Sequence, residues 1–217
     1  MFYWLVKAQI KIMYLLVSLF QNILQWIIQA DQKLFILING KLTNPFLDSV
    51  YPWWREAVTW TPLYLFILAF LFINYGWKTW PWLLFVVFNI LLTDQVSSNL
   101  IKHYFMRPRP CSDPIFQFNV RLLLDHCSGG YSFTSSHATN HFGFAMFVSQ
   151  TLKPVINKFR WPLFLWAGSI AYGQVYVGVH YPVDVLVGTL LGCTIGYFVA
   201  SFYNRRIATH FPLTNAS

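Results

Sequence analysis

Two histidines in this chain stand in surroundings that suit nucleophilic and acid–base chemistry. The first is His180, which is followed by Pro182 and, four residues on, by Asp184. A proline favours the first turn of a helix, so the acid falls in that turn and can accept the proton of one imidazole nitrogen. The other nitrogen is then free to attack an electrophile. A helix-capping acid beside an ordinary interfacial histidine is the alternative for this segment alone.

The second histidine, His137, closes a run of small hydroxylated residues that opens directly into an apolar stretch. Such residues often cap helix N-termini, which explains one of Ser135 and Ser136 but not the histidine. A helix N-terminus presents free backbone N–H groups and the positive end of its dipole to anions. We therefore expect an anion site at this turn, with His137 at its rim.

A third group places three cations within eight residues, Lys102, Arg107 and Arg109, with Pro108 and Pro110 stiffening the backbone beside them. A cationic flank that anchors a membrane helix to lipid headgroups is one interpretation. The other is a phosphate site, since arginine forks bind phosphate oxygens bidentately. Together the three groups supply what phosphoryl transfer without a metal requires: donors for the equatorial oxygens, one nucleophile and one acid.

The composition indicates a membrane protein. Of 217 residues, 56% are hydrophobic and 10% are charged, whereas about a quarter are charged in a soluble domain. The 20% aromatic content excludes a disordered chain, and the basic residues behind the net charge of +8 are scattered, which argues against a nucleic-acid partner. Three cysteines fit neither a disulfide scaffold nor a zinc pattern, so we expect no metal site.

Six apolar stretches reach or approach the length of about 20 residues that a transmembrane helix needs. We expect an all-α membrane bundle of about six helices, forming one domain over residues 1–217, with the active site at the outer membrane boundary. In the last stretch Gly188, Gly192 and Gly196 predict close helix packing. The six stretches are Ile12–Ala30, Ala57–Tyr75, Thr79–Thr93, Ala138–Leu152, Trp161–Val179 and Val185–Asn204.

The first stretch leaves two alternatives open. No cleavage site for a signal peptide follows it, so we expect it to remain attached. Its polar residues recur at helical spacing and form one stripe, which either faces other helices in a membrane span or lies in the membrane interface. The stripe consists of Ser18, Gln21, Asn22, Gln25 and Gln29.

The distribution of charge predicts the orientation. If all six stretches span the bilayer, one set of loops is basic and free of acidic residues, and the positive-inside rule makes that side cytoplasmic, together with both termini. Residues 31–56 then form short helices on the outer surface, and residues 103–136 form the outer loop of the active site. In that loop Cys111 and Cys127 can pair in an oxidising compartment. The inner basic residues are Lys7, Lys11, Lys78, Lys153, Lys158, Arg160, Arg205 and Arg206.

The three chemical groups resemble the signature of the type 2 phosphatidic acid phosphatase family. Its first element is Lys, six residues and Arg-Pro; its second is Pro-Ser-Gly-His; its third is Ser-Arg, five residues, His, three residues and Asp. The spacing within all three elements agrees with this chain. The matching residues are Lys102, Arg109 and Pro110 in the first element, Ser135 and His137 in the second, and His180 and Asp184 in the third.

The third element departs from the family at two positions. Gln174 stands where the family has a phosphate-binding arginine, and Gly173 stands where it has the preceding serine. A neutral amide can donate a hydrogen bond but brings no charge, and losing a charge-assisted contact costs about 1.5–3 kcal/mol. Arg107 is the residue that we expect to compensate.

The resemblance implies a two-step displacement without a metal or any other cofactor. His180, oriented by Asp184, would attack phosphorus and form a phosphohistidine, and His137 would protonate the leaving oxygen. Water would then release the phosphate, with His137 as the base. The phosphate would be held by Lys102, Arg109, Gln174, the turn of Ser135 and Ser136, and in addition Arg107.

The resemblance also implies a lipid substrate, because a site at the membrane boundary receives a phosphate headgroup while the lipid tail stays in the bilayer. Undecaprenyl diphosphate, phosphatidylglycerol phosphate, phosphatidic acid and the phosphates of lipid A are the candidates. We expect a bacterial inner-membrane hydrolase with its site facing the periplasm and no obligate protein partner. A lipid phosphotransferase using the same site, and a non-catalytic lipid binder or transporter, are the alternatives.

Overall fold

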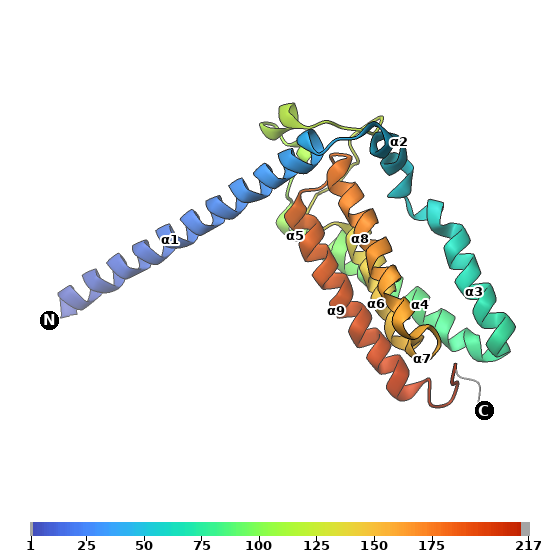
Figure 1. The fold of residues 1–217 in the computed structure, drawn as a ribbon. Coiled ribbons are helices and arrows are strands. Elements are labelled where there is room, and N and C mark those ends of the chain that lie inside the picture. The colour runs from blue at the N-terminus through green and yellow to red at the C-terminus, as the bar shows by residue number, and fades with distance from the viewer. Residues whose placement is uncertain (1, 214–217) are drawn as a thin grey trace.

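A computed structural model describes residues 2–213, and in this range the chain is all-α, as predicted (Figure 1). Long helices occupy all six predicted apolar stretches, because uninterrupted apolar runs satisfy their backbone groups internally. Three shorter helices connect them. The long helices are α1 (Phe2–Ile36), α3 (Thr61–Tyr75), α4 (Thr79–Asp94), α6 (Ser136–Thr151), α8 (Trp161–Tyr176) and α9 (Pro182–Arg206), and the short ones are α2 (Pro45–Trp54), α5 (Lys102–Phe105) and α7 (Lys153–Ile156).

Among the described residues, three stretches are long and apolar enough to cross a membrane: Lys11–Lys41, Ala57–Ser112 and Pro182–Arg206. The middle stretch contains both α3 and α4, which run antiparallel in Figure 1. Helices α6 and α8 have 16 residues each, or about 24 Å, which is less than the roughly 30 Å of a hydrocarbon core. The predicted count of six spans therefore stays a prediction.

Helix α6 lies at the centre of the bundle and packs most closely against α9. A Cβ atom added to Gly192 would lie 2.2 Å from the carbonyl oxygen of Thr139, and one added to Gly196 would lie 2.5 Å from that of Gly143. The glycines thus allow contact between two backbones, which confirms the predicted role in helix packing. This contact fixes the N-terminal ends of α6 and α9 beside each other, since the backbone N–H of Ser135 donates to the carbonyl of Asp184 over 3.0 Å.

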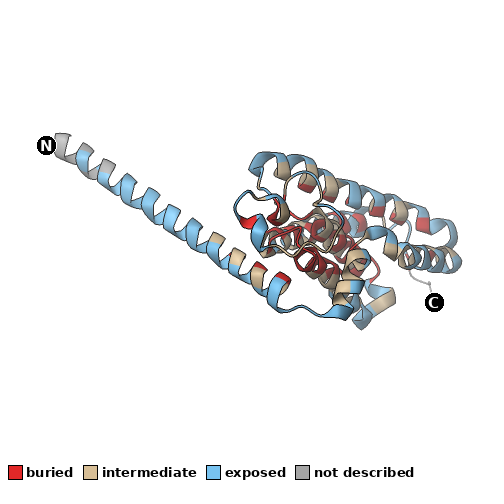
Figure 2. Ribbon diagram, turned by 90° about the horizontal axis from the view of Figure 1, so that it is seen from above, coloured by how far each residue is buried: buried red, intermediate tan, exposed pale blue. Residues whose placement is uncertain are grey.

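Helix α1 leaves the bundle at an angle, and its described side chains outside its C-terminal end are exposed (Figure 2). The polar stripe of the first stretch is exposed as well and does not face the other helices. The expectation that short surface helices begin at residue 31 is wrong, because α1 continues to Ile36 and then as a π-helical turn to Lys41. Asp31 and Phe35 are buried against the bundle there, and α2 is the separate surface helix.

The predicted outer loop is irregular between α5 and α6 apart from two short 3-10 turns, Pro110–Ser112 and Phe116–Asn119. A disulfide joins Cys111 to Cys127, the pairing that the sequence left open. The backbone N–H of Ser132 donates to the carbonyl of Arg107 over 2.8 Å, which ties the end of the loop to its beginning. The loop thereby covers the end of the bundle at which α6 and α9 begin.

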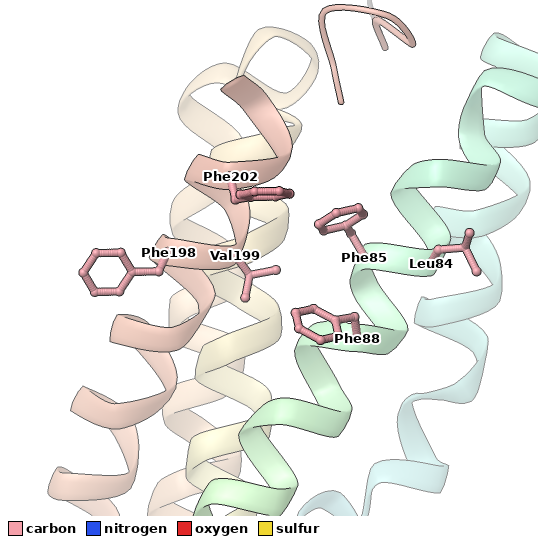
Figure 3. Close-up of a pocket in the computed structure, with 6 residues that line it drawn as sticks. All are labelled: Leu84, Phe85, Phe88, Phe198, Val199 and Phe202. Carbon is pink, nitrogen blue, oxygen red and sulfur yellow. The ribbon is translucent and has the colours of Figure 1, made fainter. Parts of the chain in front are cut away.

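An apolar groove lies between α4 and α9 (Figure 3). It occupies the part of α9 near Phe198 and Phe202, about 20–27 Å along the helix from Asp184. Its lining carries no charged side chain, so the groove is not part of the candidate site. The lining residues are Leu84, Phe85, Phe88, Phe198, Val199 and Phe202.

Candidate active site

The three groups of chemical residues meet at one end of the bundle. Arg109 Nη1 lies 3.0 Å from Nε2 of His180, and Arg107 Nη1 donates to Asp184 over 2.7 Å, so the first group contacts the third. The second group joins them through the hydrogen bond from Ser135 to the backbone of Asp184. The loop after α5, the start of α6 and the start of α9 position these side chains.

The contacts of His180 define its tautomer. The guanidinium of Arg109 can only donate, so Nε2 must be the accepting nitrogen and Nδ1 must carry the proton. The ring is 1% exposed, and this burial lowers the pKa of His180 to about 4, against the opposing effect of Asp184. His180 is therefore neutral at pH 7, with its lone pair on Nε2.

Ser132 lies between His180 and Asp184. Nδ1 of the histidine is 3.7 Å from the carboxylate, which is too long for the direct hydrogen bond that the sequence predicted. The Ser132 hydroxyl lies 3.3 Å from Nδ1 and donates to Asp184 Oδ2. The same oxygen also accepts from the backbone N–H of Tyr181 over 2.8 Å. With Arg107, three donors thus hold the fully buried carboxylate, two from the loop between α5 and α6 and one from the start of α9, and Ser132 links the carboxylate to the histidine.

Arg107 bridges two buried carboxylates. Its Nη1 pairs with Asp184 over 2.7 Å and its Nη2 pairs with Asp31 over 2.6 Å, and its guanidinium lies 4.0 Å from the centre of the Tyr181 ring. Asp31 in turn accepts from the backbone N–H of Val183 in the first turn of α9 over 2.8 Å. Both outer nitrogens of Arg107 are therefore engaged within the protein, which favours a positioning role over the predicted contact with phosphate.

Of the buried donors that have no hydrogen-bond partner in the part of the chain that the structure describes, two belong to the predicted site residues: Arg109 Nε and Gln174 Nε2. The other nitrogens of Arg109 also donate to the carbonyls of Val179 and Gly129 over 3.2 and 3.1 Å. Buried donors are normally paired, and an anion with several acceptor oxygens satisfies such groups. Lys102 adds a charge that acts on both His137 and His180.

The turn before α6 is held in place by its own hydroxyl groups. Ser135 caps the helix by accepting from the backbone N–H of Ala138 over 3.4 Å, and the Ser136 hydroxyl lies 2.8 Å from that of Ser98. Both hydroxyls are engaged, so an anion here would contact the free backbone N–H groups of the first helical turn. His137 lines a cleft of about 550 Å³ on one side and a cavity of about 260 Å³ on the other.

Three residues that contact this site were not predicted from the sequence: Asp31, Ser132 and Arg55. For Asp31 the sequence offers a weak indication of a site role, since an acidic residue at the end of an apolar stretch is costly unless it has a partner. Ser132 and Arg55 lie in segments without a pattern. Arg55 Nε donates to Oε1 of the fully buried Gln174 over 3.1 Å, from a position 119 residues away in the chain.

Comparison with known proteins decides the family. Residues 82–208, more than half of the chain, match the PAP2 superfamily. The chain belongs to this superfamily. Its match includes every residue of the three groups and, in agreement with the sequence analysis, makes the chain a membrane-embedded lipid phosphate phosphatase.

Individual relatives agree with this assignment. The PAP2 chain is similar to a lipid A 4'-phosphatase of Porphyromonas gingivalis, with 31% identity over 83% of this chain and 75% of the relative. The crystal structure of Aquifex aeolicus LpxE has 30% identity and a TM-score of 0.56, over 78% of this chain and 93% of the other. A phosphatidylglycerolphosphate phosphatase of Bacillus subtilis shares the fold, with 24% identity and a TM-score of 0.58 over 86% and 88% of the two chains.

Proposed function

We propose that this chain hydrolyses a phosphate monoester of lipid A through a phosphohistidine on His180. The observation that carries the proposal is the tautomer of His180, whose Nε2 accepts from Arg109 while Nδ1 faces Ser132. A neutral imidazole with a defined lone pair is the state that a nucleophile requires. The choice of lipid A rests on the relative from Porphyromonas gingivalis.

In the first step, Arg109 Nη1 transfers its hydrogen bond from His180 Nε2 to a phosphate oxygen, and the released lone pair of Nε2 attacks phosphorus opposite the ester oxygen of the lipid. The N–P bond forms, the P–O bond to the lipid breaks, and His137 gives a proton to the leaving alkoxide. Burial lowers the pKa of His137 in the free protein, so it takes up this proton when the phosphate anion of the substrate binds beside it. The positive charge that develops on the imidazole is stabilised by the buried carboxylate of Asp184, transmitted through Ser132. The product of this step is the dephosphorylated lipid.

In the second step, water attacks the phosphohistidine. His137, now neutral, takes a proton from this water, the N–P bond breaks, and inorganic phosphate leaves with His180 restored. The position of His137 on the wall of the 550 Å³ cleft supports its role as the base, since the group must reach the attacking water. Neither step requires a metal.

The phosphate would be bound by Lys102, Arg109, Gln174 and the first turn of α6. The unpaired donors Arg109 Nε and Gln174 Nε2 support this assignment, because each is buried and can donate to an equatorial oxygen. The outward orientation is supported by the disulfide in the active-site loop, since disulfides persist in oxidising compartments. We therefore place the site at the periplasmic boundary of a bacterial inner membrane, with both termini in the cytoplasm.

The test is phosphate release by detergent-purified protein with EDTA present. The panel contains lipid A, phosphatidylglycerol phosphate, phosphatidic acid and undecaprenyl diphosphate, and His180→Ala is the control. We expect release from lipid A that His180→Ala abolishes. Preference for another lipid would overturn the substrate assignment, and transfer of the phosphate to a lipid acceptor instead of water would make the chain a phosphotransferase.

A further inference from the structure

The position of Gln174 is unusual because the phosphatase signature places an arginine there. The structure brings an arginine to the same place from another part of the chain. Arg55 follows α2, is 5% exposed, and donates through Nε to the side-chain oxygen of Gln174 over 3.1 Å. Its Nη1 pairs with Glu56, a residue with 47% of its side chain exposed.

Gly173, the second departure from the signature, provides the space for this arrangement. A Cβ atom at Gly173 would lie 2.8 Å from Cδ1 of Tyr51 in α2 and 3.6 Å from Cβ of Arg55. A serine at this position would therefore force the Tyr51 ring, which packs α2 against α8, to shift. The two departures from the signature are structurally linked. Gly173 lets α2 approach α8, and Gln174 accepts the hydrogen bond of the Arg55 guanidinium, which follows α2.

Hydrogen bonds hold α2 against α8 on both sides of Gln174. The hydroxyl of Tyr176 donates to Asp48 over 2.6 Å, and the indole N–H of Trp54 donates to the hydroxyl of Ser169 over 2.9 Å. These contacts join the beginning and the end of α2 to α8. Arg55 is thereby held in one place, as a residue that recognises a small anion must be.

Arg55 faces His137, one of the two reacting histidines. It lines the same 550 Å³ cleft as His137, and its charge acts on His137 and on Arg109. Glu56 offsets part of the repulsion between the two guanidinium groups, and an anion bound near both would offset more of it. A phosphate oxygen also supplies the acceptor that the unpaired Nε2 of Gln174 lacks.

We propose that Arg55 is the phosphate-binding cation that replaces the missing arginine of α8, with Gln174 orienting its guanidinium and Gly173 making room for it. This inference rests on the proposed phosphatase function. It assigns the compensating charge to Arg55 and leaves Arg107 as the residue that positions Asp184. The guanidinium reaches the same phosphate from the end of α2 instead of from α8.

The experiment compares Arg55→Ala with Arg55→Ala/Gln174→Arg in detergent, and Arg205→Ala at the exposed far end of α9 serves as the matched control. We expect Arg55→Ala to lower kcat/KM for the lipid substrate about 10- to 100-fold, the equivalent of one charge-assisted hydrogen bond. The second substitution restores the charge from α8, so we expect it to recover most of this loss. Arg205→Ala should leave kcat/KM unchanged.

A second readout does not depend on turnover. Vanadate, a phosphate analogue, should raise the Tm of the unaltered protein and of the Arg55→Ala/Gln174→Arg variant, and raise that of Arg55→Ala much less. An Arg55→Ala variant with unchanged kcat/KM and an unchanged vanadate shift would overturn the inference. So would a loss that Gln174→Arg fails to recover, since Arg55 would then only attach α2 to α8. If the unaltered protein releases no phosphate from any lipid, the proposed function fails instead, and the vanadate shift still reports on Arg55.

Discussion

Arg109 donates a hydrogen bond over 3.0 Å to Nε2 of His180, the nitrogen to which we assign the attack on phosphorus. This contact keeps the lone pair of His180 on Nε2 and directs its proton toward Ser132. The same guanidinium retains an unpaired Nε for a phosphate oxygen. In the mechanism that we propose, one side chain therefore fixes the tautomer of the nucleophile and also helps to hold the phosphate that this nucleophile attacks.

The acid limb of the pH profile should report the low pKa of His180. Burial lowers this pKa from 6.5 to about 4, so the nucleophile stays neutral well below pH 6. We expect kcat/KM to stay constant down to about pH 5 and to fall near pH 4. The values are corrected for ionisation of the substrate, which phosphorus NMR measures. A limb at pH 6.5 would contradict the burial argument.

The same shift in pKa predicts how stability depends on pH. The unfolded chain binds a proton at His180 below about pH 6.5, whereas the folded chain does so only near pH 4. This group therefore makes the free energy of unfolding decrease as the pH falls from about 6.5 to about 4. The variant His180→Gln, which cannot titrate, should show a smaller decrease over that window in thermal denaturation.

Ser132 should act as a positioning residue between His180 and Asp184. Removing its hydroxyl in Ser132→Ala leaves Nδ1 of the histidine 3.7 Å from the carboxylate with no bridging group. We expect kcat to fall about 10- to 100-fold with little change in KM, since the phosphate contacts remain. Ser149→Ala is the matched control, because its buried hydroxyl bonds only within α6, to the carbonyl of Met146. An equal loss in both variants would show a general packing effect.

Replacing either Arg107 or Asp31 should lower kcat in the same way, because the two residues act on Asp184 through one ion-pair network. Arg107→Ala removes a charged hydrogen bond to Asp184, at a cost of about 1.5–3 kcal/mol, and Asp31→Ala releases the other end of Arg107. We expect both variants to lower kcat while the inhibition constant of inorganic phosphate stays the same. If Arg107→Ala alone raised that constant, Arg107 would bind phosphate directly, as the sequence had predicted.

The helices were predictable because their signal is local. Six long apolar runs gave the six long helices, and the glycines of α9 gave its contact with α6. The three chemical groups were visible for the same reason, since their spacing lies within single segments. The departure of α1 from the bundle was not predictable, because apolar side chains indicate a lipid or a protein environment alike.

The unpredicted residues come from contacts distant in the sequence. Arg55 and Gln174 are separated by 119 residues, Arg107 and Asp31 by 76, and Ser132 and Asp184 by 52. Only the packed helices bring such pairs together, so no spacing rule could reveal them. The sequence did mark the position of Gln174 as lacking a charge, but it could not name the arginine that lies beside it.

The central claim is that His180 becomes phosphorylated during turnover. The most direct measurement is rapid-quench mass spectrometry of the protein mixed with the lipid phosphate, with the quench held alkaline to preserve phosphohistidine. We predict one phosphoryl group on His180 of the unaltered protein. In His137→Ala, given a substrate whose leaving group needs no acid, the phosphohistidine should accumulate because the base that activates water is missing. Turnover with no phosphoryl group on His180 in either protein would contradict the account.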